Sequence, residues 1–315
     1  MARLRLISSG GLTTLQDLGR PGYQRFGLSP AGAVDDFSLR AGNLLLGNEP
    51  GAAALEMTGL GPTIEFLDEV LFVLTGADLG ASLDGISIPR WEVLRARPGS
   101  LLTFSGLKAG FRGYLAVAGG FDVPLVLGSR STDLTAGLGG YQGRALRAGD
   151  TLITFPVPLV PGLVGRRLHP QLVPTYSSPV FLRAVSGPQE DFFTPESVAA
   201  FFSSSYQVTP QLDRVGIKFA GPALEYRQSG DLISEGNPVG AVQVPRNGQP
   251  ILLLAGRHTV GGYPKVAVVI GADLPRAGQL KPGDAVYFQR VTLEEAQQLW
   301  RQYQTTRHRL RAVWR

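Results

Sequence analysis

An acid and an arginine close together in a turn are the first side chains of this sequence that could do chemistry. Asp17 and Arg20 stand three residues apart in the stretch 13–24, TTLQDLGRPGYQ. At this spacing the two charges can bond to each other and fix the turn, or both can face a ligand. The sequence leaves both interpretations open.

A second group surrounds Arg130 in the stretch Gly128-Ser129-Arg130-Ser131-Thr132. A guanidinium that is flanked by hydroxyls and follows a glycine can bind an anion with its planar fork and with exposed backbone donors. We therefore expect Arg130, Ser131 and Thr132 to bind an anionic or polarised oxygen.

Glu235 and Gln243 bracket a predicted strand in the stretch 234–245. A glutamate can move protons, and a glutamine amide can recognise another amide because it both donates and accepts. Asp213 and Arg214 lie in a turn whose sequence, 211–216, weakly resembles 15–20. A solvated hairpin is the alternative for the 234–245 stretch.

Lys265 closes the stretch Gly261-Gly262-Tyr263-Pro264-Lys265. Paired glycines allow the backbone to approach a ligand closely. The chain has 4 lysines against 26 arginines, so a lysine kept here suggests a specific use. A solvated lysine is the alternative, and Tyr263 is a candidate for substrate binding.

Several other kinds of chemistry find no support in the sequence. There is no cysteine, and the three histidines, His169, His258 and His308, are far apart, so no metal site is predicted. A phosphate-binding loop G-x-x-x-x-G-K-[ST] and a G-x-S-x-G elbow are both missing.

The charge distribution argues against nucleic acid as a partner. The net charge is +5, and residues 301–315 alone hold five arginines and no acid. The basic pI therefore describes the end of the chain rather than a binding face. No apolar run approaches the ~18 residues of a membrane span. We expect a cytoplasmic protein that binds neither nucleic acid nor membrane.

These polar turns must be positioned by a mainly β fold. Short apolar runs closed by glycine, at 71–74, 114–118, 251–255 and 266–270, read as buried strands. A basic residue, a glycine turn and an alternating strand recur at 97–104, 147–155 and 281–288. We expect short helices that begin after Asp35 or Asp36 and after Thr194. A capping box at 292–295 should open a C-terminal helix that ends near Gln304.

A proline-rich stretch divides the chain. We expect an N-terminal β domain over 1–155, a linker over 156–178, a C-terminal β domain over 179–290, and a helix with a basic tail over 291–315. The polar turns should lie at strand ends, where side chains can line a cleft.

Together, the stretches 13–24, 128–132, 234–245 and 261–265 resemble the biotin-dependent carboxyltransferase family. This family is also called allophanate hydrolase subunit 2 and includes the C subunit of bacterial 5-oxoprolinase. The resemblance spans about residues 5–290 and implies two packed β-barrel domains of cyclophilin-like type. It also implies a partner that is similar to the B subunit of 5-oxoprolinase, an allophanate hydrolase subunit 1-like protein.

The resemblance implies a subunit of an ATP-dependent 5-oxoprolinase complex, an amide-bond hydrolase that opens 5-oxoproline to glutamate and works only with its partner subunits. ATP then belongs to the complex. One alternative is carboxyl transfer from carboxybiotin to urea or a related amide, with the biotin carried by another protein. A second is a regulatory protein that antagonises a kinase inhibitor and has no chemistry.

Residue types suggest the roles within an enzyme. We expect Arg130, Glu235, Lys265 and Asp17 to take part in catalysis, because an amide needs its oxygen polarised and its protons moved. A further set is expected to bind substrate: Arg20, Ser131, Thr132, Asp213, Arg214, Gln243 and Tyr263. Gly256 stands where the family usually has an aspartate, which puts activity in doubt if that aspartate is catalytic.

Overall fold

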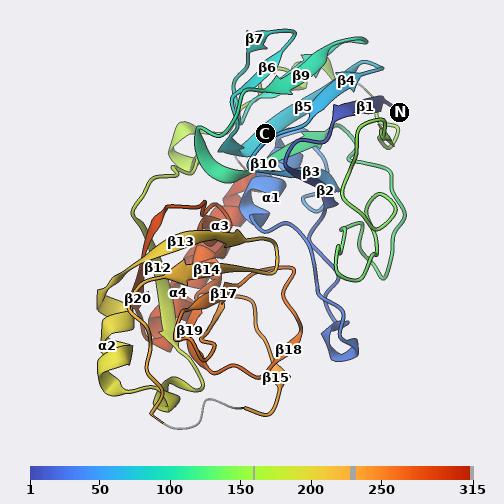
Figure 1. Ribbon diagram of the computed structural model, residues 1–315. Helices are drawn as coiled ribbons and strands as arrows, with labels where there is room; N and C mark the ends of the chain where they lie inside the picture. The colour runs from blue at the N-terminus through green and yellow to red at the C-terminus, as the bar shows by residue number, and fades with distance from the viewer. Residues whose placement is uncertain (159, 228–231, 313–315) are drawn as a thin grey trace. The chain divides into compact units, whose positions relative to one another are not determined.

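The computed structural model describes residues 1–158, 160–227 and 232–312. The chain forms two compact units. Unit 1 comprises 1–20, 31–176 and the end of the chain from 309; unit 2 comprises 21–30 and 177–308. Both units are built mainly from strands, so the predicted mainly β class is confirmed (Figure 1).

Unit 1 contains two sheets. The strands of the first, in spatial order, are β11 (Thr151–Ile153), β1 (Arg3–Ser8), β4 (Thr63–Phe66), β9 (Leu101–Phe104), β6 (Ala81–Leu83) and β7 (Ile86–Ser87). Those of the second are β2 (Leu12–Gln16), β3 (Ala54–Thr58), β10 (Ala109–Val117), β5 (Val70–Asp78) and β8 (Val93–Ala96).

Inward-facing side chains from both sheets form one apolar core, in which Leu4, Leu55, Phe72 and Leu115 are fully buried. The strands are amphipathic or wholly apolar because alternate side chains enter this core. Helix α1 (Asp36–Leu45) contacts β5 and β10. Asp35 caps this helix by accepting a hydrogen bond from the backbone N–H of Ser38, as the sequence predicted.

Unit 2 contains a closed barrel. Its strands, in order around the barrel, are β12 (Val180–Ser186), β19 (Lys265–Val269), β16 (Ala241–Gln243), β17 (Ile251–Leu253), β14 (Gly216–Ala220), β13 (Ser205–Leu212) and β20 (Ala285–Arg290). Strands β12 and β20 pair in parallel, and the other neighbours pair antiparallel. A separate ribbon joins β15 (Glu235–Gly236) to β18 (Val260–Gly261).

Helices α2 and α4 of unit 2 begin where the sequence predicts, whereas the short helix α3 was not predicted. Helix α2 (Pro195–Ser203) is capped by Thr194, and α3 is a single turn over Leu274–Ala277. Thr292 and Glu295 form the predicted capping box of α4. This helix (Leu293–Ala312) continues well past the expected end near Gln304.

Short 3₁₀ turns complete the structure: η1 (Gln24–Phe26), η2 (Pro161–Leu163), η3 (Pro170–Leu172), η4 (Glu190–Phe192) and η5 (Gly271–Asp273). Turns η2 and η3 lie in the proline-rich stretch 156–178. No helix within residues 1–158, 160–227 and 232–312 combines the length and apolar character needed to cross a bilayer.

Candidate functional site

Asp17 binds the loop that carries Arg130, and both belong to unit 1. Asp17 follows β2, and its Oδ1 accepts hydrogen bonds from the hydroxyls of Ser129 (2.6 Å) and Ser131 (2.5 Å). The same oxygen accepts the Gly19 N–H (2.7 Å), and Oδ2 accepts the Arg130 N–H (2.6 Å). The donors that we expected to bind an external anion therefore hold the carboxylate of Asp17.

The Arg130 side chain projects from this loop. Its Nε donates to the Val123 carbonyl oxygen (3.1 Å), and its guanidinium lies over the Phe155 ring (4.9 Å to the centroid). Within the described residues, Nε is the side-chain atom of Arg130 that forms a hydrogen bond, so Nη1 and Nη2 can donate to a substrate oxygen. Thr132 is committed to the fold, because its hydroxyl donates to the Leu15 carbonyl oxygen (3.0 Å).

Arg20 bonds to this loop rather than to Asp17. Its Nη2 donates to the carbonyl oxygen of Ser131, and its side chain is 1% exposed. Burial lowers the pKa of the guanidinium, while Asp133 and Asp17 act in the opposite direction. A Cβ on Gly139 would overlap the Ser131 carbonyl oxygen and lie 2.6 Å from Arg20 Nη2, so only glycine fits here.

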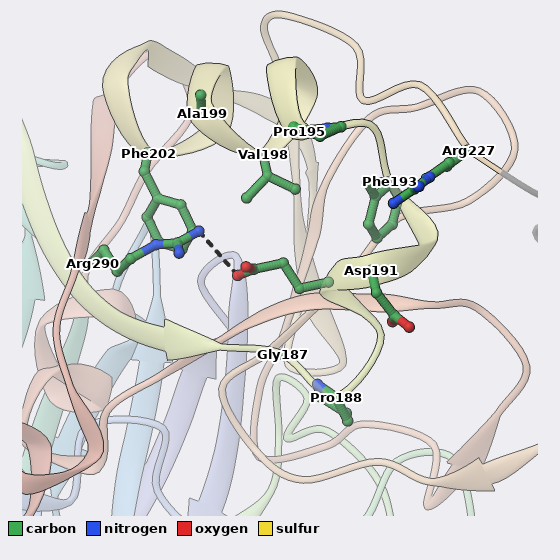
Figure 2. Close-up of a pocket in the computed structure, with 11 residues that line it drawn as sticks. Gly187, Pro188, Asp191, Phe193, Pro195, Val198, Ala199, Phe202, Arg227 and Arg290 are labelled. Carbon is green, nitrogen blue, oxygen red and sulfur yellow. Dashed lines mark hydrogen bonds and ion pairs between the residues drawn. The ribbon is translucent and has the colours of Figure 1, made fainter.

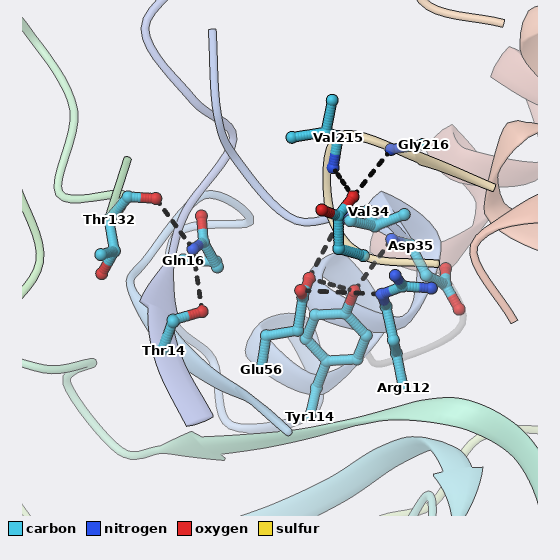
Figure 3. Close-up of polar contacts among 11 residues, drawn as sticks. Thr14, Gln16, Val34, Asp35, Glu56, Arg112, Tyr114, Thr132, Val215 and Gly216 are labelled. Atoms are coloured by element: carbon cyan, nitrogen blue, oxygen red, sulfur yellow. Dashed lines mark hydrogen bonds and ion pairs between the residues drawn. The ribbon is translucent and has the colours of Figure 1, made fainter. Parts of the chain in front are cut away.

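Gln16 is a polar residue of the same region that the sequence did not single out. Its side chain is fully buried, and its Nε2 donates to Thr14 Oγ1 (3.0 Å) and to the Thr132 carbonyl oxygen (3.1 Å), as Figure 3 shows. Gln16 therefore ties the end of β2 to the loop beside Asp17.

Figure 3 also shows a buried polar network on β3 and β10. The Tyr114 hydroxyl donates to Glu56 Oε2 (2.7 Å) and accepts the Asp35 N–H (2.8 Å). Arg112 Nε lies 3.9 Å from Glu56 Oε1. Burial and the neighbouring Glu56 raise the pKa of the Tyr114 hydroxyl well above its ordinary value, so the hydroxyl stays protonated as a donor. This network joins the start of α1 to the second sheet.

Lys265 and Glu235 meet in unit 2. Lys265 Nζ lies 2.7 Å from Glu235 Oε1, and the side chains are 1% and 42% exposed. The Lys265 hydrogen bond is the main cause that lowers the pKa of Glu235. The pair thus presents a buried ammonium whose carboxylate partner reaches the surface.

Gln189 holds this pair and was not among the expected site residues. Its Nε2 donates to Glu235 Oε1 (2.8 Å), and its Oε1 accepts the backbone N–H of Lys265 (3.1 Å). The only sequence signal is the polar turn 187–191, which reads as an ordinary loop. Gly187 packs directly on the Lys265 carbonyl, which leaves no space for a side chain.

Gln243 ends β16 and pairs with Lys265 of β19 in the barrel. Its Nε2 donates to Asn237 Oδ1 (3.0 Å), and Asn237 Nδ2 donates to the His258 carbonyl oxygen (3.2 Å). A Cβ on Gly261 would lie 2.8 Å from Asn237 Nδ2 and 3.0 Å from Gln243 Nε2. The first glycine of the sequence motif, Gly261, thus packs closely on two side-chain amides, and Gly262 packs on the Leu232 carbonyl oxygen.

Asp213 and Arg214 belong to the turn between β13 and β14. Asp213 Oδ1 accepts the N–H groups of Val215 (2.7 Å) and Gly216 (3.0 Å). Gly256 donates its N–H to the Arg214 carbonyl oxygen, and a Cβ at Gly256 would lie 3.0 Å from that oxygen. Gly256 therefore lies in a tightly packed turn, and a side chain at this position would require the Arg214 backbone to move.

Two pockets lie in unit 2. Tyr263, which is half exposed, lines one of about 660 Å³ together with Lys218, Phe219 and Gln249. Figure 2 shows the other, of about 650 Å³, with Phe193, Val198 and Phe202 beside the Arg290–Glu190 ion pair (3.0 Å). Because these rim charges neutralise each other, the second pocket has no clear preference for an anion.

The expected site residues therefore form local groups. Asp17, Arg20, Arg130, Ser131 and Thr132 meet in unit 1. Glu235 and Lys265 bond in unit 2, Gln243 is the strand partner of Lys265, and Tyr263 lines a pocket. Among the described residues, no cluster of three or more acids and histidines could hold a metal ion.

The chain is similar in sequence and in structure to several known proteins. The C subunit of 5-oxoprolinase from Escherichia coli (strain K12) is 41% identical over 294 residues, which cover 93% of each chain. The same subunit from Haemophilus influenzae is 38% identical over 300 residues, 95% of each chain. The crystal structure of Kluyveromyces lactis urea carboxylase matches 98% of this chain with a TM-score of 0.91 at 29% identity, although the chain spans only 29% of that protein. Residues 26–290 match the model of the carboxyltransferase domain, subdomain A and B, and the chain belongs to this family.

Proposed function

We propose that this chain is a subunit of an ATP-dependent 5-oxoprolinase complex that opens 5-oxoproline to glutamate. Its partner is a protein like the B subunit of 5-oxoprolinase, of the allophanate hydrolase subunit 1-like kind. The observation that carries the proposal is the 41% identity to the C subunit of a 5-oxoprolinase over 93% of both chains. ATP is bound by the complex, whose site of action is the cytoplasm. No metal site is predicted in this chain, and biotin belongs only to the alternative function below.

The chemistry requires water to add to the lactam carbonyl carbon, the ring C–N bond to break, and the nitrogen to gain a proton. Lys265 suits stabilisation of the negative charge that develops on the carbonyl oxygen. Its ammonium is desolvated, so it interacts more strongly than a solvated cation would. Glu235 stays ionised at neutral pH because its pKa is lowered, and it can accept a proton or orient the ring N–H.

The residues of unit 1 support a second set of roles. The Nη1 and Nη2 atoms of Arg130, which form no hydrogen bond among the described residues, can polarise a substrate oxygen. Asp17 contributes by fixing the loop, because its carboxylate already accepts four hydrogen bonds. We assign substrate contacts to Arg20 in unit 1 and to Asp213, Arg214, Gln243 and Tyr263 in unit 2, whereas the hydroxyls of Ser131 and Thr132 hold the loop in place.

A second function has a specific observation in its favour. The structural similarity to urea carboxylase, with a TM-score of 0.91, fits a carboxyltransferase that moves a carboxyl group from carboxybiotin to urea or a related amide. In that case biotin comes from another protein.

The test is a coupled assay on the chain assembled with its partner subunits. We expect 5-oxoproline-dependent formation of glutamate and ADP, and no carboxylation of urea when a carboxybiotin carrier is supplied. Arg130→Ala should abolish turnover while the complex still assembles. Arg95→Ala is the matched control, because Arg95 is half exposed and its ion pair in the described part of the chain is with Glu69 at the surface. Assembly without turnover of 5-oxoproline would refute the proposal, and urea carboxylation would establish the alternative.

A further inference from the structure

Gln16 and Arg20 are buried in unit 1 and retain unused hydrogen-bonding atoms. Within the described part of the chain, Gln16 Oε1 has no donor, and Arg20 Nε and Nη1 have no acceptor. Buried polar groups are nearly always paired in folded proteins, so each unpaired group calls for an explanation. Because Gln16 and Arg20 are only four positions apart, one explanation should account for both.

Both side chains are anchored to the same loop by their other atoms. Gln16 Nε2 donates to the carbonyl oxygen of Thr132, and Arg20 Nη2 donates to the carbonyl oxygen of the preceding residue, Ser131. The Gln16 amide cannot turn over, because its oxygen would then face the Thr132 carbonyl oxygen. The remaining atoms are therefore an acceptor on Gln16 and a donor edge on Arg20.

Within the described residues, Arg20 forms no ion pair at 4.0 Å or less, although the charges of Asp133 and Asp17 act to raise the pKa of its guanidinium. Of the two nearby acids, Asp17 is occupied by four donors, and Asp133 Oδ1 accepts the N–H groups of Thr135 and Ala136. A buried guanidinium without a bonded anion is costly, and a planar carboxylate can meet its Nε and Nη1 at once.

We propose that Gln16 and Arg20 form a recognition pair for a small carboxylic acid that carries an N–H group beside its carboxylate. Arg20 binds the carboxylate through Nε and Nη1, and Gln16 Oε1 accepts the N–H. This inference rests on the proposed function, because in 5-oxoproline the carboxylate is attached to the ring carbon next to the N–H. Gln16 thereby joins the residues that determine specificity.

The ligand itself provides the sharpest test. Binding is measured by titration calorimetry on the full chain, alone and with its partner subunits, with ATP omitted. The probes are 5-oxoproline, 2-pyrrolidinone, which lacks the carboxylate, and N-methyl-5-oxoproline, which lacks the N–H. We expect the wild-type chain to bind 5-oxoproline at least about tenfold more tightly than either analogue, the size expected for one charged or buried hydrogen bond.

The variants assign each preference to one residue. Arg20→Met should bind 5-oxoproline no better than 2-pyrrolidinone, and Gln16→Met should lose only the preference over N-methyl-5-oxoproline. Arg95→Met, at a half-exposed side chain of β8, should keep both preferences. A wild-type chain that does not bind 5-oxoproline or does not discriminate, or an Arg20→Met variant that still prefers the carboxylate, would overturn the inference.

Turnover separates this inference from the proposed function. A complex that converts 5-oxoproline but shows no such selectivity retains the proposed function and loses the recognition pair. A chain that shows the selectivity in a complex without turnover retains the pair and loses the hydrolase.

Discussion

Replacing Asp17 with alanine removes the acceptor of four hydrogen bonds at once. Two donors are the hydroxyls of Ser129 and Ser131, which can rotate toward other acceptors. The other two are the backbone N–H groups of Gly19 and Arg130, which cannot turn away. Counting only the backbone donors, at about 1.5–3 kcal/mol for each bond to a charged group, Asp17→Ala should lower the free energy of unfolding by about 3–6 kcal/mol.

The measurement combines urea unfolding with hydrogen exchange of peptides that cover 126–140. Exchange should accelerate there, because the Thr132 N–H is held against Leu15 only while the loop is fixed. Asp68→Ala is the control, since Asp68 pairs with the exposed Arg3 and its loss should cost less than about 1 kcal/mol. An Asp17→Ala variant as stable as the control, with unchanged exchange at 126–140, would refute the assignment of Asp17 as the anchor of this loop.

Three further predictions concern the packing and charge of the same groups. Gly139→Ala should lower the thermal unfolding temperature at least twice as much as Gly99→Ala. Both glycines have positive φ, but only Gly139 has neighbours in the way, so equal shifts would contradict the packing argument. Gln189→Leu leaves the buried Lys265 N–H unpaired and should lower the free energy of unfolding by about 1–3 kcal/mol. The control is Gln302→Leu, at an exposed position, which should have no such effect in urea unfolding. Equal effects of the two substitutions would show that Gln189 is not structural. Because the pKa of Glu235 is lowered in the folded chain, its ionised form stabilises the fold. This stabilisation is complete above the ordinary glutamate pKa of 4.5 and is lost as the pH falls through the lowered pKa. The thermal unfolding temperatures of wild type and Glu235→Gln should therefore converge in acid. A difference that persists at low pH would assign the effect to packing instead of charge.

Local signals in the sequence predict the elements well. The glycine-closed apolar runs at 71–74 and 266–270 lie in β5 and β19, and Asp35, Thr194 and Thr292 cap helices as expected. These features depend on neighbours in the chain, which is why a pattern reveals them. The end of α4 is less predictable, because no glycine or proline follows Gln304 to stop the helix.

Contacts between residues that are far apart in the chain could not be predicted from the sequence. The motifs around Asp17 and Arg130 are both visible, yet the bond between Asp17 and Ser129 joins positions 112 residues apart. The role of Gln189 could not be predicted for the same reason. It lies in an ordinary polar turn, and only the fold brings Glu235 to its Nε2 and the Lys265 N–H to its Oε1. The closed barrel of unit 2 and the two sheets of unit 1 likewise follow from strand pairing over long separations.

In unit 1, the loop that contains Ser131 is bonded to the carboxylate of Asp17 and to the guanidinium of Arg20. The two groups differ in how many of their hydrogen-bonding atoms are already used. Asp17 has four donors, whereas Arg20 has two donor atoms without acceptors among the described residues, and both are attached through Ser131. A ligand carboxylate can add to Arg20 without displacing Asp17, but it depends on Asp17 to keep the Ser131 carbonyl in place. Asp17→Asn should accordingly weaken binding of 5-oxoproline and of 2-pyrrolidinone by similar factors, because it displaces the whole loop, whereas Arg20→Met should weaken only the former. If Asp17→Asn instead removed the carboxylate preference alone, Asp17 would act directly on the ligand, and its four internal hydrogen bonds would not describe the bound state.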